Sequence, residues 1–139
     1  MVRRTVDQLL EAARSGLERV GPEQARAAIE DGAVLVDIRG DRQRERDGVV
    51  PGAIHHPRNV LEWRADPGCS VRDPRIADYG AHVIVMCDQG YQSSLAAANL
   101  QALGLTRATD LDGGFQAWRA AGLPVEALRH TGEDAGGDL

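Results

Sequence analysis

The chain has 139 residues, enough for one domain of ordinary size but too few for two stable cores. Its net charge of −5 argues against a broad nucleic-acid-binding surface. The sequence contains no lysine, so all 16 of its cationic side chains are arginines. Chemistry that requires a lysine, such as a Schiff base or a lysine-containing phosphate loop, is therefore excluded.

The sequence shows no sign of a membrane or secretory segment. No apolar run approaches the roughly 18 residues that a membrane-spanning helix needs, and the first residues lack the apolar stretch of a secretory signal. Two cysteines, Cys69 and Cys87, are too few for a disulfide framework and lack the spacing of metal ligands. We expect a cytoplasmic protein with free thiols and no metal.

The first part of the chain is expected to be helical. Thr5 and Gln8 have the spacing of a capping box, and the apolar residues that follow predict a helix over about residues 6–17. A second helix is predicted over about 22–30, with a proline in its first turn. We expect residues 1–19 to form a helical extension to the main domain.

Two short apolar runs, residues 33–38 and 82–86, have almost no polar alternation. This pattern is typical of central parallel strands that are buried on both faces. Further strands are predicted at about residues 51–55 and 108–111. Residues 39–50 alternate arginines with acidic residues and are interpreted as a solvated surface loop.

The remaining segments complete an alternating pattern. We expect a helical turn at residues 59–65, a loop at 66–78, and helices at 93–103 and 115–121. Strands that alternate with helices predict one α/β domain over residues 20–127, with a small central parallel sheet and helices on both faces. The Gly- and acid-rich residues 128–139 are expected to be a disordered tail.

Cys87 stands where a predicted buried strand ends and a tight loop begins. Ligand sites in open parallel sheets lie beyond the carboxyl ends of the strands. Gly90 permits a sharp turn, and successive backbone N–H groups before the next helix form an anion-binding nest. Such a nest favours a reactive thiolate. The alternative is that Cys87 is only a small core residue.

Four short segments follow one another at a spacing shared with a known family. They are the strand with Asp-x-Arg at residues 34–39, Pro-Gly-Ala-x-His at 51–55, Cys-x-x-Gly-x-x at 87–92 and Gly-Gly-x-x-x-Trp at 113–118. On these segments the chain resembles the single-domain rhodanese-like sulfurtransferases over roughly residues 20–125. The resemblance implies the three-layer rhodanese-like fold.

The resemblance also implies a two-step sulfur transfer. The Cys87 thiolate would take the outer sulfur of thiosulfate or a persulfide, and a thiol or cyanide would remove that sulfur from the Cys87 persulfide. The partners would be these small molecules, with no cofactor, nucleic acid or membrane, and the protein would be a monomer or homodimer. The loop residues expected to surround the substrate are Asp88, Gln89, Gly90, Tyr91, Gln92 and Ser93.

The loop departs from many family members because it contains no arginine or lysine. Asp88, directly after the nucleophile, disfavours the thiolate and repels a dianionic donor. We therefore expect weak activity with thiosulfate and a preference for a less charged donor. A catalytically inactive binding or regulatory module remains the alternative. A phosphatase is disfavoured because the loop lacks an arginine to hold a phosphoryl group and is one residue too short.

Asp37, Arg39 and Arg58 are candidates to border the same pocket. Asp37 and Arg39 end the neighbouring strand, and Arg39 or Arg58 would replace the missing loop cation. The alternative is that Asp37 caps loop N–H groups and pairs with Arg39.

Five other residues have simpler interpretations. The adjacent His55 and His56 lack a third ligand for a metal site. Cys69 is expected to be a spectator thiol, with resolution of a Cys87 persulfide as the alternative. Trp63 and Trp118 are expected to be packing residues, with Trp118 anchoring the last helix to the core.

Overall fold

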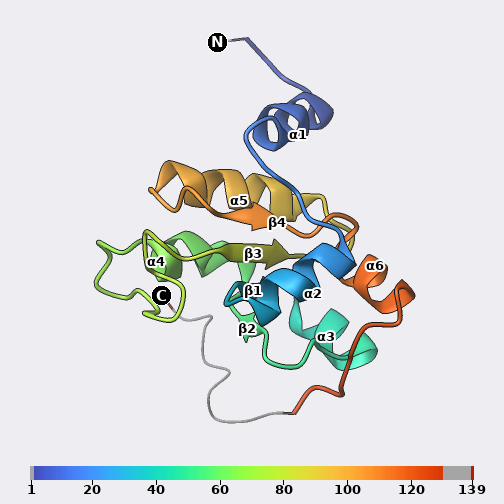
Figure 1. Cartoon of the computed structure of the whole chain (residues 1–139). Coiled ribbons are helices and arrows are strands. Elements are labelled where there is room, and N and C mark those ends of the chain that lie inside the picture. The colour runs from blue at the N-terminus through green and yellow to red at the C-terminus, as the bar shows by residue number, and fades with distance from the viewer. Residues whose placement is uncertain (1, 130–138) are drawn as a thin grey trace.

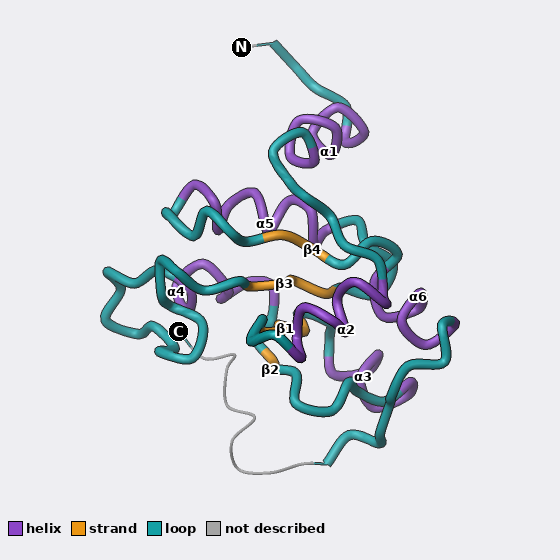
Figure 2. Tube along the Cα trace, viewed as in Figure 1, coloured by secondary structure: helices purple, strands orange, loops and turns teal. Residues whose placement is uncertain are grey.

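The computed structural model describes residues 2–129 and residue 139, and it shows an α/β fold around a four-stranded parallel sheet (Figures 1 and 2). The strand order is β2-β1-β3-β4, and Val36 of β1 pairs with Val85 of β3 in the centre. The four strands lie within the predicted ranges but are shorter than predicted. They are β1 (Val34–Asp37), β2 (Ile54–His55), β3 (Val83–Met86) and β4 (Thr109–Asp110).

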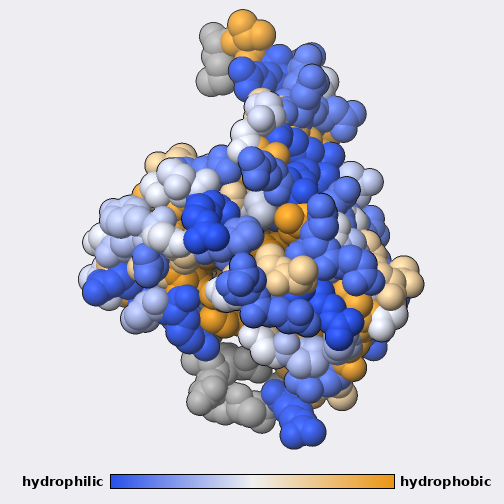
Figure 3. Space-filling model, in the orientation of Figure 1, coloured by the Kyte–Doolittle hydropathy of each residue, from blue (hydrophilic) through white to orange (hydrophobic). Residues whose placement is uncertain are grey.

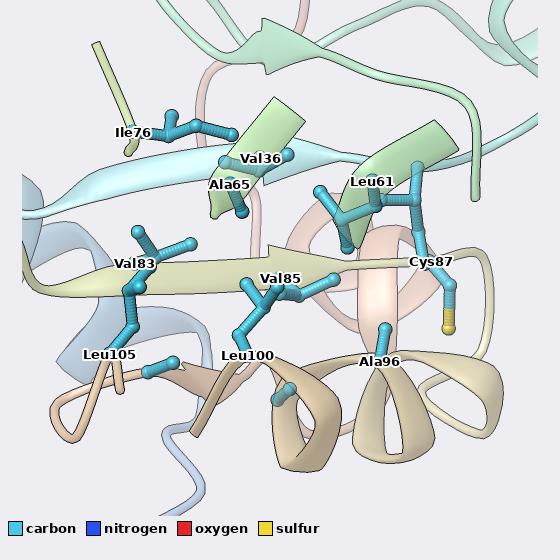
Figure 4. Packing of buried hydrophobic residues seen from close by; sticks show 13 residues of the cluster. Val36, Leu61, Ala65, Ile76, Val83, Val85, Cys87, Ala96, Leu100 and Leu105 are labelled. Atoms are coloured by element: carbon cyan, nitrogen blue, oxygen red, sulfur yellow. The ribbon is translucent and has the colours of Figure 1, made fainter. Parts of the chain in front are cut away.

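Helices cover both faces of the sheet, as predicted. The α2 (Pro22–Glu30) and α6 (Gly114–Ala120) helices pack on one face, and α4 (Leu61–Ala65) and α5 (Gln92–Ala102) pack on the other (Figure 1). The completely apolar β3 alternates between these two layers because successive strand residues point to opposite faces. Val83, Val85 and Cys87 therefore belong to the cluster under α4 and α5 (Figure 4), and Ile84 and Met86 to the other.

The predicted N-terminal helix forms and packs across α5. The helix α1 (Val6–Arg14) begins with the expected capping box, in which Thr5 Oγ1 accepts from Gln8 N and Gln8 Oε1 accepts from Thr5 N. Leu10 is its buried residue, and α1 contacts α5 at the edge of the domain (Figure 1). The helix ends before the predicted position 17 because Ser15 and Gly16 follow, and glycine disfavours helix continuation.

Residues 39–50 were predicted to be a solvated loop, and this prediction is wrong. The segment contains the helix α3 (Asp41–Asp47), and Arg39 and Arg44 are buried. Both arginines turn toward the buried carboxylate of Asp37, whose charge requires compensation away from water. Arg39 also lies 3.7 Å over the ring of Phe115. The alternating charges therefore belong to the helix α3, which turns Arg44 inward toward the buried Asp37.

The connection from β2 to β3 starts with a short helical region and continues as a loop. The helical turn predicted at 59–65 is a 3-10 helix (Arg58–Val60) followed by α4. Residues 66–81 contain no helix or strand. His56 Nε2 lies 2.7 Å from Asp73 Oδ2, and Arg75 also pairs with this carboxylate, so the loop is tied to the end of β2.

The two tryptophans differ in their surroundings. Trp118 is buried and donates from Nε1 to Pro124 O over 2.8 Å, as expected of a core residue. Trp63, also expected to be a packing residue, is 53% exposed. It lies on the short helix α4, which buries Leu61 and Ala65 instead. A five-residue helix has room for only one buried stripe.

The face shown in Figure 3 carries hydrophilic side chains with scattered apolar patches between them. Within the described part of the chain, no helix has the length and apolar character needed to span a bilayer. Of the predicted disordered tail, residues 130–138 lie outside the described residues.

The start of α6 positions the loop that follows β3. Gly113 and Gly114 have φ angles of 78° and 62°, in the left-handed region that favours glycine. A Cβ on Gly114 would lie 2.5 Å from the carbonyl oxygen of Cys87. Phe115 N donates to this same oxygen over 2.9 Å. The glycine pair therefore allows α6 to dock directly on the backbone after β3.

We predict that Gly114→Ala destabilises the protein by about 1–3 kcal/mol, because the methyl group combines a strained φ with a backbone clash. Urea unfolding measures this change. Gly68→Ala is the matched control because Gly68 does not have a positive φ and has no neighbour closer than 3.5 Å. Its effect is expected to stay within about 0.5 kcal/mol. Equal stabilities of the two variants would contradict the proposed role of the close contact.

We also predict that stability decreases as pH falls. Burial lowers the pKa of His56 below its ordinary value of 6.5 and outweighs the hydrogen bond and charge of Asp73, which act in the opposite direction. The charges of Arg75 and Arg64 add to the lowering. Because the folded-state pKa is depressed, the stabilisation is fully present above about pH 6.5 and is lost as pH falls toward the folded-state value. Burial acts in the same direction on His55 and His82.

Urea unfolding at about pH 7.5 and about pH 5.5 tests this expectation. His56→Gln retains an N–H donor for Asp73 but removes the titration, so its stability should depend less on pH. An unchanged or higher unfolding midpoint at the lower pH would be inconsistent with the depressed histidine pKa values.

Candidate active site

The side chain of Cys87 lies at the carboxyl end of β3, at the bottom of a cavity of about 320 Å³. The thiol is almost completely buried, with 2% of the residue exposed. Its Sγ accepts a hydrogen bond from Gly90 N over 3.1 Å. In Figure 4 the sulfur lies beyond Val83 and Val85, beside the beginning of α5. The loop thus brings a backbone donor to a nucleophilic atom.

The cavity is lined by polar side chains from two segments. Among the described residues that line it, one is a carboxylate and none is a cation. The lining residues are Gln43 from α3 and Cys87, Asp88, Gln89, Tyr91 and Gln92 from the loop and the start of α5.

Asp88 is held toward α6. Its Oδ1 accepts from Gln116 Nε2 over 2.9 Å, and the same nitrogen donates to Asp47 Oδ2 over 3.2 Å. The hydrogen bond from Arg46 is the main reason why the pKa of Asp47 falls to about 2. Gln116 N also donates to Asp88 O. The acidic loop residue therefore belongs to a network of charges between α3 and α6.

The loop is also anchored through a buried carboxylate on β4. Asp110 has no exposure to solvent and accepts from Ser93 Oγ over 2.7 Å and from Ser94 Oγ over 2.8 Å. Arg19 completes the arrangement by donating from Nε and Nη2 to the two carboxylate oxygens. Ser93, predicted to surround the substrate, thus directs its hydroxyl to Asp110.

Two arginines from the N-terminal segment reach the loop. Arg14 Nη2 and Arg19 Nη2 each donate to Gly90 O over 2.9 Å. Arg14 also donates from Nε to Ser94 Oγ over 3.0 Å and lies 6.0 Å from the ring of Tyr91. Sequence reasoning missed both arginines and Asp110. No local signal could have found these contacts because more than 70 residues separate each arginine from Gly90.

The other predicted site residues lie away from this cavity. Arg39 donates from its backbone N, Nε and Nη2 to Asp37, and from Nη2 also to Gly48 O. These are the contacts of the alternative in which Asp37 caps the turn and pairs with Arg39. Arg58 donates to Glu62, one turn further along the chain. None of the three lines the cavity at Cys87.

His55 and His56 contact neighbouring protein groups, and both cysteines are free. His55 Nε2 lies 3.0 Å from Arg39 O, whereas His56 is engaged by Asp73. Across residues 2–129 and 139, no group of three or more histidine, cysteine, aspartate or glutamate side chains is arranged to hold a metal ion. Cys69 and Cys87 are both free thiols.

Comparison with known proteins agrees with this geometry. The model of the rhodanese-like domain family matches residues 21–121. Thiosulfate sulfurtransferase GlpE of Pseudomonas fluorescens (strain SBW25) is 40% identical over 113 residues, which is 81% of this chain and 93% of that protein. The residues matched by the family model include the Cys87 loop and the α6 segment.

Two solved structures are similar in fold. A protein of unknown function from Rhodopseudomonas palustris CGA009, described as a possible tyrosine phosphatase, is 35% identical with a TM-score of 0.81. The match covers 91% of this chain and 97% of that one, so it includes part of the segment before residue 21.

A rhodanese-related protein from Thermoplasma volcanium has a TM-score of 0.64 at 23% identity, covering 79% of this chain and 98% of that one. This likeness concerns the fold alone. The family match over most of the chain and the 40% identity to the Pseudomonas protein lead to one conclusion. The chain belongs to the rhodanese-like domain family.

Proposed function

We propose that the protein is a sulfurtransferase that carries sulfane sulfur as a persulfide on Cys87. The observation that supports this proposal best is the Cys87 Sγ at the bottom of an open cavity, with the Gly90 N–H directed at it. A backbone donor in this position favours an anionic sulfur. It serves the thiolate before transfer and the persulfide after it.

The first step breaks a sulfur–sulfur bond in the donor. The Cys87 thiolate attacks the outer sulfur of thiosulfate, the bond between the two donor sulfurs breaks, and sulfite leaves with the bonding electron pair. With a persulfide donor, the thiolate attacks the outer sulfur in the same way and the leaving group is a thiolate. In both cases Cys87 gains one sulfur atom.

The second step regenerates the enzyme. An acceptor with an affinity for sulfur, such as a thiolate or cyanide, attacks the outer sulfur of the Cys87 persulfide. The sulfur–sulfur bond breaks, its electrons return to Cys87 Sγ, and a persulfide or thiocyanate leaves. Both steps exchange sulfur between nucleophiles, so no external oxidant or reductant is needed. A cytoplasmic setting, where thiols remain reduced, suits a protein with two free cysteines.

The charges around the cavity favour a donor with little negative charge. The lining includes Asp88 and no cation, so a dianion such as thiosulfate meets repulsion at the entrance. Gln43, Gln89, Tyr91 and Gln92 instead offer neutral hydrogen-bonding groups. We therefore infer that a persulfide reacts more efficiently than thiosulfate.

A catalytically inactive binding module is the second candidate, because Asp88 disfavours an anionic substrate next to Cys87. A phosphatase activity has less support, although one solved relative is described as a possible tyrosine phosphatase. The cavity lining contains no arginine that would hold a phosphoryl group. Turnover of p-nitrophenyl phosphate that depends on Cys87 would favour the phosphatase.

We predict that incubation with thiosulfate, or with a low-molecular-weight persulfide, adds one sulfur atom to Cys87. Intact-mass spectrometry detects the adduct, and cyanide should remove it. Cys69→Ser is the matched control and should still form the adduct, whereas Cys87→Ser should not. If neither donor produces an adduct on Cys87, the protein is not a sulfurtransferase and the binding-module alternative is favoured.

A second prediction concerns Asp88. Asp88→Asn should raise kcat/KM with thiosulfate by about fivefold, because removing one partly exposed like charge is worth roughly 1 kcal/mol. The asparagine retains an oxygen that can accept from Gln116. The gain with a singly charged persulfide should be smaller, and steady-state kinetics with both donors measures the difference. Equal gains for the two donors would contradict an electrostatic effect of Asp88.

A further inference from the structure

The N-terminal segment contributes two cations to an active loop that contains none of its own. We propose that Arg19 and Arg14 are positioning residues of the Cys87 site, which hold the Gly90 backbone in place and favour a negative charge on the Cys87 sulfur. This inference deepens the proposed sulfurtransferase function and rests on it for its biological meaning. It assigns a role in the site to a segment that precedes the residues matched by the family model.

The geometric part of the proposal centres on Gly90. Its carbonyl oxygen accepts from both arginines over 2.9 Å, and its N–H donates to Cys87 Sγ over 3.1 Å. Gly90 has a φ of 86°, and a Cβ here would lie 2.7 Å from Gly113 N and 3.3 Å from Arg19 Nη2. The residue is thus held between α6 and the arginines. Its position determines where the hydrogen-bond donor meets the sulfur.

The electrostatic part depends on which charges are already compensated. Arg19 pairs with the buried Asp110 and with the exposed Asp112. Arg14 donates only to the neutral acceptors Gly90 O and Ser94 Oγ, and within the described residues no carboxylate forms an ion pair with it. One cation at the loop therefore has no carboxylate partner. We infer that this charge adds to that of Arg19 in favouring an anionic Cys87 sulfur.

Arg19 is also close enough to Cys87 for their charges to interact. Burial lowers the pKa of Arg19, but the hydrogen bond and the charge of Asp110 outweigh this effect. The charges of Asp112 and of the Cys87 thiolate act in the same direction, so the pKa is raised overall. On the opposite side of the loop, Asp88 is engaged by Gln116.

A purely structural role is the competing explanation, because Arg19 compensates the buried charge of Asp110. The two explanations differ in what they predict for Asp110 itself. If Arg19 acts electrostatically on the sulfur, removing Arg19 and removing the charge of Asp110 shift the pH midpoint of Cys87 alkylation in opposite directions. If Arg19 only supports the fold, the two substitutions leave this midpoint unchanged or shift it in the same direction.

The experiment measures the pH dependence of Cys87 alkylation by iodoacetamide. All variants carry Cys69→Ser, so only one thiol reacts. We expect Arg19→Gln and Arg14→Gln to move the midpoint of alkylation to higher pH by about 0.5–1 unit. This is less than the effect of a cation in direct contact with the thiolate, because both arginines also bind other groups. Asp110→Asn should move the midpoint to lower pH. Arg19→Lys retains the charge and should restore most of the wild-type behaviour.

Two further variants keep the test decisive. Arg26→Gln is the matched control, because Arg26 is exposed on α2 and pairs only weakly with Glu30. It should leave the midpoint unchanged. Arg19→Gln alone leaves Asp110 buried without its counter-charge, so the double variant with Asp110→Asn serves if the single variant does not fold. Its midpoint should lie above that of Asp110→Asn.

The proposal is overturned if all midpoints coincide, or if Arg19→Gln and Asp110→Asn shift the midpoint in the same direction. Alkylation reports on the thiol and does not require sulfur transfer. Failure of wild-type protein to form a persulfide would therefore remove the proposed function without affecting the alkylation result. Unshifted midpoints with normal persulfide formation would instead remove only the role of the arginines.

Discussion

A single buried carboxylate, Asp110, constrains both the fold and the site. A charge with no exposure to water costs several kcal/mol unless ion pairs and hydrogen bonds compensate it. Here the compensation comes from two hydroxyl groups at the start of α5 and from Arg19. Because Arg19 also reaches Gly90, the side chain that stabilises β4 simultaneously fixes the loop around Cys87.

The loop around Cys87 is supported from two sides by different physical means. On one side, the absence of side chains at Gly113 and Gly114 lets the start of α6 approach the backbone of Cys87 and Asp88. On the other side, long charged side chains span the distance from the N-terminal segment. A hydrogen-bond donor held in this way needs little reorganisation when charge develops on the sulfur.

Much of the fold could be predicted from local patterns in the sequence. Nearly continuous apolar residues at 33–38 and 82–86 identified the two central strands, because strands buried on both faces lack regular polar alternation. The capping box at Thr5 identified the start of α1. The position of Cys87 followed from the end of its strand.

Other features depend on contacts that no local pattern encodes. Alternating arginines and acids look the same in a solvated loop and in α3, whose Arg44 turns toward a buried carboxylate. The partners of Arg14 and Arg19 lie more than 70 residues away in sequence. The sequence therefore showed that the loop lacks a cation of its own, but only the packing of α1 on α5 reveals which arginines approach it.

Because of Arg19, the residues matched by the family model differ from the residues needed to compensate the buried charge of Asp110. The residues that match the family begin at 21, so a recombinant fragment or a fusion partner designed from that boundary would retain Cys87 and all four family segments. It would also leave Asp110 buried without the guanidinium that neutralises it. In this protein the unit matched by the family model is smaller than the unit that is electrostatically complete.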